Sequence, residues 1–209
     1  KRLAKKNILK FNNKPLIMWT IEAALRSRMI DEVIVSSNCK IIKKICYRYK
    51  KVCFSQRPEK LSTSKSIISE TILYEINKND LKKFDYLILL QPTSPLRNLI
   101  DIDKSIKFII KKKINSCVSF FKPDINLNNI YKINQKKVEK LFKYKKVPQI
   151  NKLYTPSGDI YISTIKNYIK NKTFFTNQTH PYFVKDYSDI DTLKEFKIAE
   201  IIQKNYLKK

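Results

Sequence analysis

Two aspartates near the end of the chain have the spacing that could hold a metal ion. Asp189 and Asp191 flank an isoleucine in the segment Ser-Asp-Ile-Asp-Thr, residues 188–192. In extended backbone, side chains at i and i+2 point to one face, so both carboxylates could share a hard divalent cation. Acidic residues also precede helices as caps, and in that interpretation Asp191 caps the next helix while Asp189 is solvated. The spacing alone leaves both interpretations open.

A hydroxyl-rich corner is the second candidate for chemistry. The segment LLQPTSPLR, residues 89–97, continues an apolar run that is typical of a buried strand. Its two prolines fix backbone angles, so the turn would present Gln91, Thr93, Ser94 and Arg97 to a base, ribose or carboxylate at little entropic cost. An ordinary strand-to-helix loop, with the hydroxyls in local turn bonds, explains the same composition.

The third candidate is a basic cluster at the start of the sequence, KRLAKKN, residues 1–7. Its lysines could neutralise a triphosphate. On charge alone, a solvated lysine-rich segment explains the cluster about as well.

Composition narrows the class of protein. The formal net charge is +26, but the lysines are spread along the chain and no nucleic-acid-binding motif is present, so we expect a solvated surface and no nucleic-acid partner. No apolar run approaches the ~18 residues that span a bilayer, and no secretory signal is evident, so a cytoplasmic protein with no membrane partner is expected. The four cysteines lack C-x-x-C spacing and His180 is the only histidine, which disfavours a structural zinc site and a Ser-His-Asp or Cys-His hydrolase.

The elements that must position these residues alternate between strand and helix. This alternation predicts an α/β domain with a doubly wound, mostly parallel sheet and helices on both faces. Ligands of such sheets bind beyond the carboxyl ends of the strands. A hairpin over 130–142, a strand over 158–163 and a final helix over 192–207 complete a single domain, residues 1–209. The earlier expected strands are 31–37, 52–54, 86–90 and 116–121, and the earlier expected helices are 16–27, 41–50, 66–76 and 101–113.

A doubly wound domain normally opens with a buried strand and a phosphate-binding turn. Here the sequence begins in a basic turn that leads directly to a helix. We therefore expect the first strand, and the start of the phosphate-binding loop, to be missing from residues 1–209.

Taken in order, several segments resemble the acylneuraminate cytidylyltransferase family, the synthetases of CMP-sialic acid and their relatives for legionaminic and pseudaminic acid. The corner LLQPTSPLR is the most specific match, because nine consecutive residues fit the family pattern. The segment PSGDIYI is similar to the family's Asn-Gly-Ala-Ile-Tyr-Ile strand, with serine in place of asparagine. The matching segments are residues 1–7, 13–27, 56–63, 89–97, 156–162 and 188–192.

The resemblance implies a Rossmann-like domain of the nucleotide-diphospho-sugar transferase type and a nucleotidyl transfer. The anomeric hydroxyl of a nonulosonic acid would attack the α-phosphorus of CTP, releasing pyrophosphate and giving a CMP-sugar. Such chemistry requires cations and positioning more than a covalent nucleophile. The implied roles are nucleotide binding by Lys1, Lys6, Asn7 and Arg57, sugar-acid binding by Gln91, Thr93, Ser94 and Tyr161, and Mg²⁺ binding by Asp189 and Asp191, with Lys1, Asp189 and Asp191 as the catalytic set.

The resemblance also implies a homodimer, formed through an arm for which residues 122–152 are the candidate. That stretch departs from the family pattern, so the identity of the acid stays open. Two alternatives remain: a nucleotidyltransferase for another sugar acid such as Kdo, and a catalytically degenerate nucleotide-binding relative.

Overall fold

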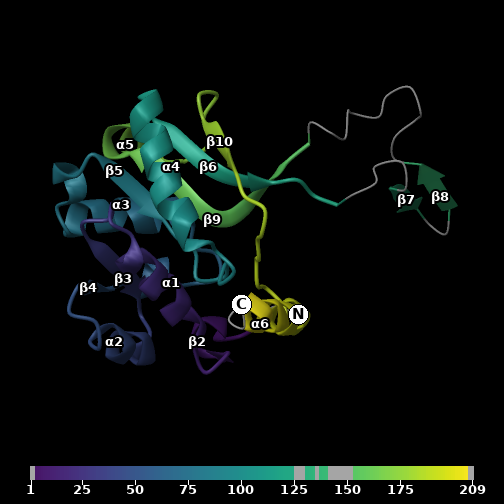
Figure 1. The fold of residues 1–209 in the computed structure, drawn as a ribbon, viewed down its shortest axis with the longest axis horizontal. Helices are drawn as coiled ribbons and strands as arrows, with labels where there is room; N and C mark the ends of the chain where they lie inside the picture. Colours follow the sequence, from purple (N-terminus) through teal and green to yellow (C-terminus); the bar gives the residue numbers. More distant parts are fainter. Residues whose placement is uncertain (1–2, 125–129, 135–136, 141–152, 207–209) are drawn as a thin grey trace.

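The computed structural model describes residues 3–124, 130–134, 137–140 and 153–206 (Figure 1). The helices are α1 (Leu16–Arg26), α2 (Lys40–Cys46), α3 (Ile68–Lys78), α4 (Leu99–Lys112), α5 (Ile165–Asn171) and α6 (Leu193–Tyr206), with short 3₁₀ turns η1 (Lys6–Ile8), η2 (Glu59–Leu61) and η3 (Leu81–Lys83). The strands are β1 (Lys10–Phe11), β2 (Lys14–Pro15), β3 (Val33–Ser37), β4 (Val52–Gln56), β5 (Tyr86–Leu89), β6 (Ser116–Phe121), β7 (Tyr131–Asn134), β8 (Lys137–Lys140), β9 (Thr155–Thr164) and β10 (His180–Phe183).

The main sheet has the order β10-β6-β9-β5, and β3 pairs with β4 beside it. Strands β5 and β6 are both antiparallel to β9 and so run in the same direction, while β6–β10 and β3–β4 are parallel. The predicted α/β fold with a mostly parallel strand direction is confirmed, and β9 is the antiparallel exception. Because β9 runs the other way, Tyr161 in β9 pairs with Leu89 at the carboxyl end of β5.

Helices cover both faces of the sheet, and the alternation of side chains along β9 separates two cores. On one face Ile160 and Ile162 pack with α1 and with the apolar stripe of α4. On the other face Tyr161 packs against the cluster built by α3 and α5. Neighbouring strand residues point to opposite faces, so one short apolar strand supplies both cores.

The two strand groups share the helices on either side of them. Ile34 of β3 and Leu87 of β5 belong to the same cluster on α3. On the other face, α1 packs Ile21 near Val35 of β3 and Ala23 near the residues of β5. Among the described strands, β4 is the hydrogen-bonded neighbour of β3, and β9 is that of β5.

Helix α5 and strand β10 were not expected from the sequence, and neither was the short pair of strands β1 and β2. Helix α5 has seven residues and begins directly after β9, where the Thr164 hydroxyl accepts a bond from the Asn167 N–H. Strand β10 contains a proline and lacks the alternation of polar and apolar residues that would predict a strand. Its parallel pairing with β6 places it in the sheet. Strand β9 also begins at Thr155, three residues before the expected start.

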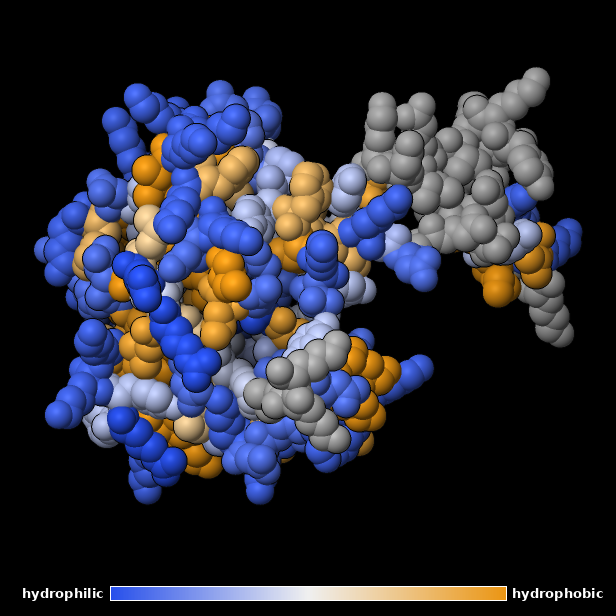
Figure 2. Space-filling model, in the orientation of Figure 1, coloured by the Kyte–Doolittle hydropathy of each residue, from blue (hydrophilic) through white to orange (hydrophobic). Residues whose placement is uncertain are grey.

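The predicted hairpin forms β7 and β8, which pair with each other and stand away from the body of the domain in Figure 1. Much of the candidate arm, residues 125–129, 135–136 and 141–152, lies outside the described residues. In Figure 2 hydrophilic side chains are spread over the visible face, as the scattered lysines of the sequence suggest. Among the described helices, none has the length and apolar character needed to cross a membrane.

Candidate active site

The corner after β5 is a pair of consecutive turns. The Ser94 N–H donates to the Gln91 carbonyl at 3.3 Å, and the Arg97 N–H donates to the Ser94 carbonyl at 3.3 Å. The Ser94 side chain is fully buried, yet its hydroxyl has no hydrogen-bond partner among the described residues. The local turn bonds that the loop interpretation assigned to this hydroxyl are therefore absent from the corner, and main-chain bonds hold it.

A buried arginine fastens the corner to the elements behind it. The Arg97 guanidinium donates to the Gln91 carbonyl at 2.8 Å, to the Thr20 hydroxyl of α1 at 3.1 Å and to the Asp159 carbonyl of β9 at 2.8 Å. Burial lowers the pKa of Arg97 to about 10, and the charge of Asp159 opposes that shift. The side chain is therefore a cation at neutral pH, and it joins α1, β9 and the corner.

Gly158 allows β9 to approach the corner closely. Its φ is +80°, and a Cβ at this position would lie 3.1 Å from the Ser94 Oγ and 3.4 Å from the Gln91 Oε1. Glycine adopts this backbone conformation without strain, whereas other residues rarely do. The glycine thus brings Gln91, Ser94 and the start of β9 into one wall.

The segment with the two aspartates is attached to the same corner. The Ile190 N–H donates to the Thr93 carbonyl at 3.0 Å, and the Leu96 N–H donates to the Ser188 hydroxyl at 3.3 Å. Ile190 is fully buried, in a cluster with Leu96 and residues of α6. The buried isoleucine fixes the segment between the two aspartates, which lie at more open positions on either side of it.

The start of α6 decides between the two interpretations of Asp191. The Thr192 hydroxyl accepts the Glu195 N–H at 3.3 Å, and the Glu195 carboxylate accepts the N–H groups of Asp191 and Thr192, each at 2.8 Å. This is a capping box formed by Thr192 and Glu195. These backbone bonds lower the pKa of Glu195. The Asp191 carboxylate is therefore not the helix cap.

Lys6 meets the aspartate segment instead. Its Nζ lies 2.6 Å from the Asp191 Oδ1 and 2.5 Å from the Ile190 carbonyl oxygen. Farther along the same segment, the Leu3 N–H donates to the Asp191 carbonyl at 2.7 Å. The Oδ1 of Asn7 is buried and has no hydrogen-bond partner among the described residues. The basic segment thus lies against Asp191, and Lys1 itself is outside the described residues.

Tyr161 lies close enough to Asp189 for the charge of that aspartate to shift the pKa of the phenol. Burial raises the pKa of Tyr161, and the charges of Asp189 and Asp159 raise it further. The phenol therefore stays protonated at neutral pH and keeps a hydroxyl that can donate. Its ring packs against Phe174 and Phe175.

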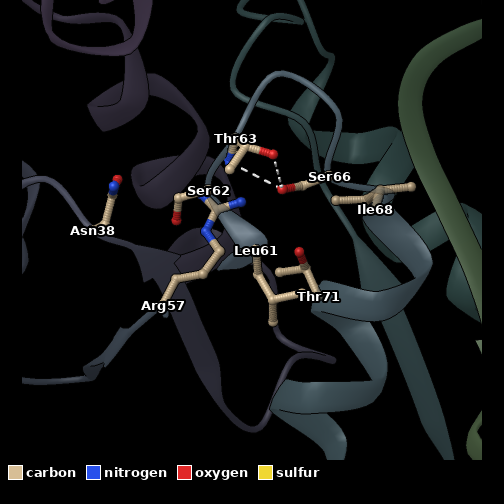
Figure 3. Close-up of a pocket in the computed structure, with 8 residues that line it drawn as sticks. All are labelled: Asn38, Arg57, Leu61, Ser62, Thr63, Ser66, Ile68 and Thr71. Carbon is tan, nitrogen blue, oxygen red and sulfur yellow. Dashed lines mark hydrogen bonds between the residues drawn. The ribbon is translucent and has the colours of Figure 1, made fainter. Parts of the chain in front are cut away.

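Arg57 lies in a separate pocket, at the carboxyl ends of β3 and β4 (Figure 3). Its guanidinium donates to the Ser36 carbonyl at 3.1 Å, whereas its buried Nε has no partner among the described residues. Burial lowers the pKa of Arg57, and the charge of Glu75 opposes the shift. The pocket has a volume of about 170 Å³, and it is lined by Asn38, Arg57, Leu61, Ser62, Thr63, Ser66, Ile68 and Thr71.

Asp189 and Asp191 offer carboxylate oxygens, the type of ligand that the expected magnesium site requires. Carboxylate oxygens are the ligands that Mg²⁺ prefers, and it usually keeps waters and phosphate oxygens in its remaining positions. Within the part of the chain that the structure describes, no group of three or more His, Cys, Asp or Glu side chains is arranged to hold a metal. Two carboxylates would leave the other positions of such an ion to waters and phosphate oxygens, so this donor set suits an open site.

Comparison with known proteins identifies the family. The family model of the cytidylyltransferases matches residues 1–209. The chain belongs to the cytidylyltransferase family. It is 30% identical to the N-acylneuraminate cytidylyltransferase of Streptococcus agalactiae serotype V over 94% of this chain and 49% of that protein. It is 33% identical to the CMP-N,N'-diacetyllegionaminic acid synthase of Legionella pneumophila over 96% of this chain and 90% of that protein.

A third cytidylyltransferase, the pseudaminic acid enzyme of Campylobacter jejuni, is 26% identical over 98% of this chain and 91% of its own length. The chain spans about half the length of the Streptococcus agalactiae relatives that it matches. Among solved structures, CMP:2-keto-3-deoxy-manno-octonic acid synthetase in complex with CTP has a TM-score of 0.70 at 14% identity, covering 99% of this chain and 94% of that one. That likeness confirms the fold.

Sequence reasoning missed two residues of this candidate site. The Thr20 hydroxyl accepts a hydrogen bond from Arg97, which is 77 positions away in the sequence. The Asp159 carbonyl also accepts one from Arg97, which is 62 positions away. Thr20 carries no signal in the sequence, since it looks like any polar residue of an amphipathic helix. Asp159 does carry one, because an acidic residue directly before the apolar run Ile-Tyr-Ile is unusual for a buried strand.

Proposed function

We propose that the chain transfers CMP from CTP to the anomeric hydroxyl of a nonulosonic acid, giving a CMP-sugar and pyrophosphate. The observation that carries the proposal is the bond from the Ile190 N–H to the Thr93 carbonyl. It joins the aspartate pair to the hydroxyl-rich corner, so the proposed cation site and the proposed acceptor wall would share one edge of the sheet. Family membership and relatives named for three such acids support the same reaction.

The residues of the chain would act by binding and positioning. Lys6 places a cation where the triphosphate would lie, and Lys1 and Asn7 are proposed beside it. Gln91 and Tyr161 would orient the acid, with Thr93 and Ser94 shaping the wall behind it. Negative charge that develops on phosphate oxygens is then stabilised by groups already in place, which is the usual source of catalysis in phosphoryl transfer.

Asp189 and Asp191 would hold Mg²⁺ between them. The ion, when bound, neutralises phosphate charge and polarises the reacting oxygen. The ion pair of Lys6 with Asp191 occupies one carboxylate oxygen, Oδ1, in the described structure. A metal held by Asp191 would compete with this ion pair, and Lys6 would then be available to the nucleotide.

The direct test is pyrophosphate release from CTP and Mg²⁺ with a panel of Neu5Ac, legionaminic, pseudaminic and Kdo acids. Release with one nonulosonic acid supports the proposal and names the substrate. Release with Kdo alone would favour the other sugar-acid enzyme. Binding of CTP without release from any acid would favour a degenerate nucleotide-binding relative.

The pocket around Arg57 is proposed as the site of the cytidine part of CTP. Its hydroxyl and amide groups offer hydrogen bonds, and the free Nε of Arg57 is a donor without a partner among the described residues. A buried donor of this kind costs free energy unless a ligand satisfies it. A base or ribose oxygen would supply the missing acceptor.

Replacement of Arg57 by alanine is expected to weaken CTP binding by about 10- to 100-fold, since hydrogen bonds from charged groups contribute ~1.5–3 kcal/mol. The KM for the acid should change little, because the hydrogen bonds of Arg57 among the described residues go to Ser36 and Ser37 and not to the corner. Isothermal titration with CTP gives the dissociation constant. Arg28→Ala, an exposed arginine after α1, is the matched control. An unchanged affinity in Arg57→Ala would remove this pocket from the nucleotide site.

We also propose a homodimer in which the hairpin β7–β8 takes part. Ile133 is 73% exposed and Val138 65% exposed, and they face each other across the hairpin. Figure 2 shows apolar side chains on this hairpin, away from the core. A two-stranded hairpin is marginally stable in water by itself, so a second chain would supply the surface that these side chains need.

Deletion of residues 130–145 is therefore expected to convert a dimer into a monomer. Sedimentation velocity measures the change, with a fall in mass to about half. An unchanged sedimentation coefficient, corrected for the lost residues, would contradict the role of this segment.

We also propose a cytoplasmic location, where CTP is available. A further strand between β3 and β5 is another part of the proposal. Helices α1 and α3 each pack against both strands. An extended segment between them would pair with β3 on one side and β5 on the other. It would also bring a phosphate-binding loop to the edge where Lys6 lies.

A further inference from the structure

A buried carboxylate behind the corner has no part in the reaction proposed above. Asp159 in β9 is 1% exposed, and neither of its carboxylate oxygens has a hydrogen-bond partner among the described residues. Burying an acid in this way is costly unless a cation faces it. Arg97 is that cation, because its charge lowers the pKa of Asp159 against the larger effect of burial.

Arg97 uses its hydrogen bonds on other groups. It donates to the Asp159 carbonyl, to Thr20 and to the Gln91 carbonyl, and it makes no hydrogen bond to the Asp159 carboxylate. The carboxylate therefore acts on Arg97 through charge alone. This charge offsets the desolvation of a guanidinium that holds three elements together.

The other groups around Asp159 do not neutralise it. The hydroxyls of Ser94 and Ser157 are near enough to lower its pKa, but neither forms a hydrogen bond of normal geometry with it. From α4 the charge of Asp101 raises that pKa, and along β9 Tyr161 feels the charge of Asp159. Among the described charged groups that influence this carboxylate, Arg97 is thus the cation.

We propose that Asp159 is a positioning residue for the acid subsite, acting through Arg97 to hold Gln91 and Ser94 in place. The kinetic test of this inference rests on the proposed function. The hydrogen-exchange test rests on the fold alone. With the charge present, Arg97 stays against β9 and its Nη2 retains the Gln91 carbonyl. Without it, the buried guanidinium has no counter-charge and the corner loses its fixed position.

The kinetic experiment compares the wild-type chain, Asp159→Asn and the control Asp31→Asn, an exposed acid before β3. Pyrophosphate release is measured first with the acid concentration varied at fixed CTP, and then with the CTP concentration varied at fixed acid. Asp159→Asn should raise the KM for the acid by about tenfold. The KM for CTP and kcat should stay within about twofold, because the hydrogen bonds of Arg97 among the described residues go to none of those that line the Arg57 pocket. Equal changes in both KM values, or none, would overturn the inference.

The pH profile separates charge from shape. Burial raises the pKa of Asp159 to about 6, so the negative charge is present above that pH and is lost as the pH falls through it. The KM for the acid should therefore rise below about pH 6 in the wild-type chain. In Asp159→Asn the KM for the acid should not depend on pH in this range, and it should stay at the raised value expected for that variant. Parallel curves would contradict the proposal.

Hydrogen exchange tests the positioning without any substrate, so it stands even if no acid is turned over. Amides of residues 91–97 should exchange about tenfold faster in Asp159→Asn than in the control, while residues 57–71 stay unchanged. Lowering the pH of the wild-type chain below 6 should loosen the same residues, after correction for intrinsic exchange, and this needs no variant that must fold. Unchanged exchange in both experiments would refute the positioning role. Loss of activity with the expected exchange would refute only the proposed reaction.

Discussion

Replacement of Asp191 by alanine is expected to lower kcat for pyrophosphate release by about 10³-fold, the scale of losing a preorganised group that stabilises transition-state charge. The change removes one of two proposed magnesium ligands. It also removes the carboxylate that orients the Nζ of Lys6, at 2.6 Å. Both effects act on charge at the phosphates, so they should appear in kcat more than in the KM for the acid.

The stability of Asp191→Ala should be close to that of the wild-type chain, because Thr192 and Glu195 cap α6 without the Asp191 carboxylate. Thermal unfolding checks this point. The matched control is Asp186→Ala, an exposed acid a few residues earlier, which should keep its activity within about twofold. Full activity in Asp191→Ala would exclude the aspartate pair as the metal site. A large loss of stability would instead support a structural role for Asp191.

Replacement of Arg97 by methionine is expected to lower the free energy of unfolding by about 3–5 kcal/mol at pH 8, the cost of leaving a buried charge without its partner. The variant loses the bonds to Thr20, Gln91 and the β9 backbone, and it leaves Asp159 buried and ionised. Urea unfolding at fixed pH measures the difference. The exposed Arg28→Met is the control, and its effect should stay within about 0.5 kcal/mol.

The pH dependence of this effect has a definite sign. The pKa of Asp159 is raised in the folded chain, from 3.8 to about 6, so the folded state binds its proton more tightly than the unfolded state does. Ionisation of Asp159 therefore lowers the free energy of global unfolding as the pH rises through about 6, even though the same charge holds Arg97 in place within the folded chain. Without Arg97 this pKa rises further and the penalty at pH 8 grows. The difference between Arg97→Met and the wild type should thus shrink near pH 5. The double variant Arg97→Met, Asp159→Leu should recover part of the loss at pH 8, and a constant difference at both pH values would contradict the pairing.

The sequence by itself determined most of the elements and the identity of the candidate residues. Helices α1 and α4 and strand β6 follow from patterns that repeat within a few residues, which is the range over which propensity and periodicity act. The corner at 91–97 and the aspartate pair are equally local, since their prolines and spacing define them. Family membership followed from the same short segments, because they occur in the same order.

Tertiary structure decided how those residues work together. The antiparallel direction of β9 depends on its pairing with β5 and β6, which no local pattern encodes. The bond from Lys6 to Asp191 spans 185 positions, and it shows the Asp191 carboxylate paired with a cation instead of capping α6. Arg97 reads as a corner residue in the sequence, yet its contacts with Thr20 and Asp159 form only when α1 and β9 pack around it. Burial and charge depend on the whole set of neighbours, and only the folded chain brings that set together.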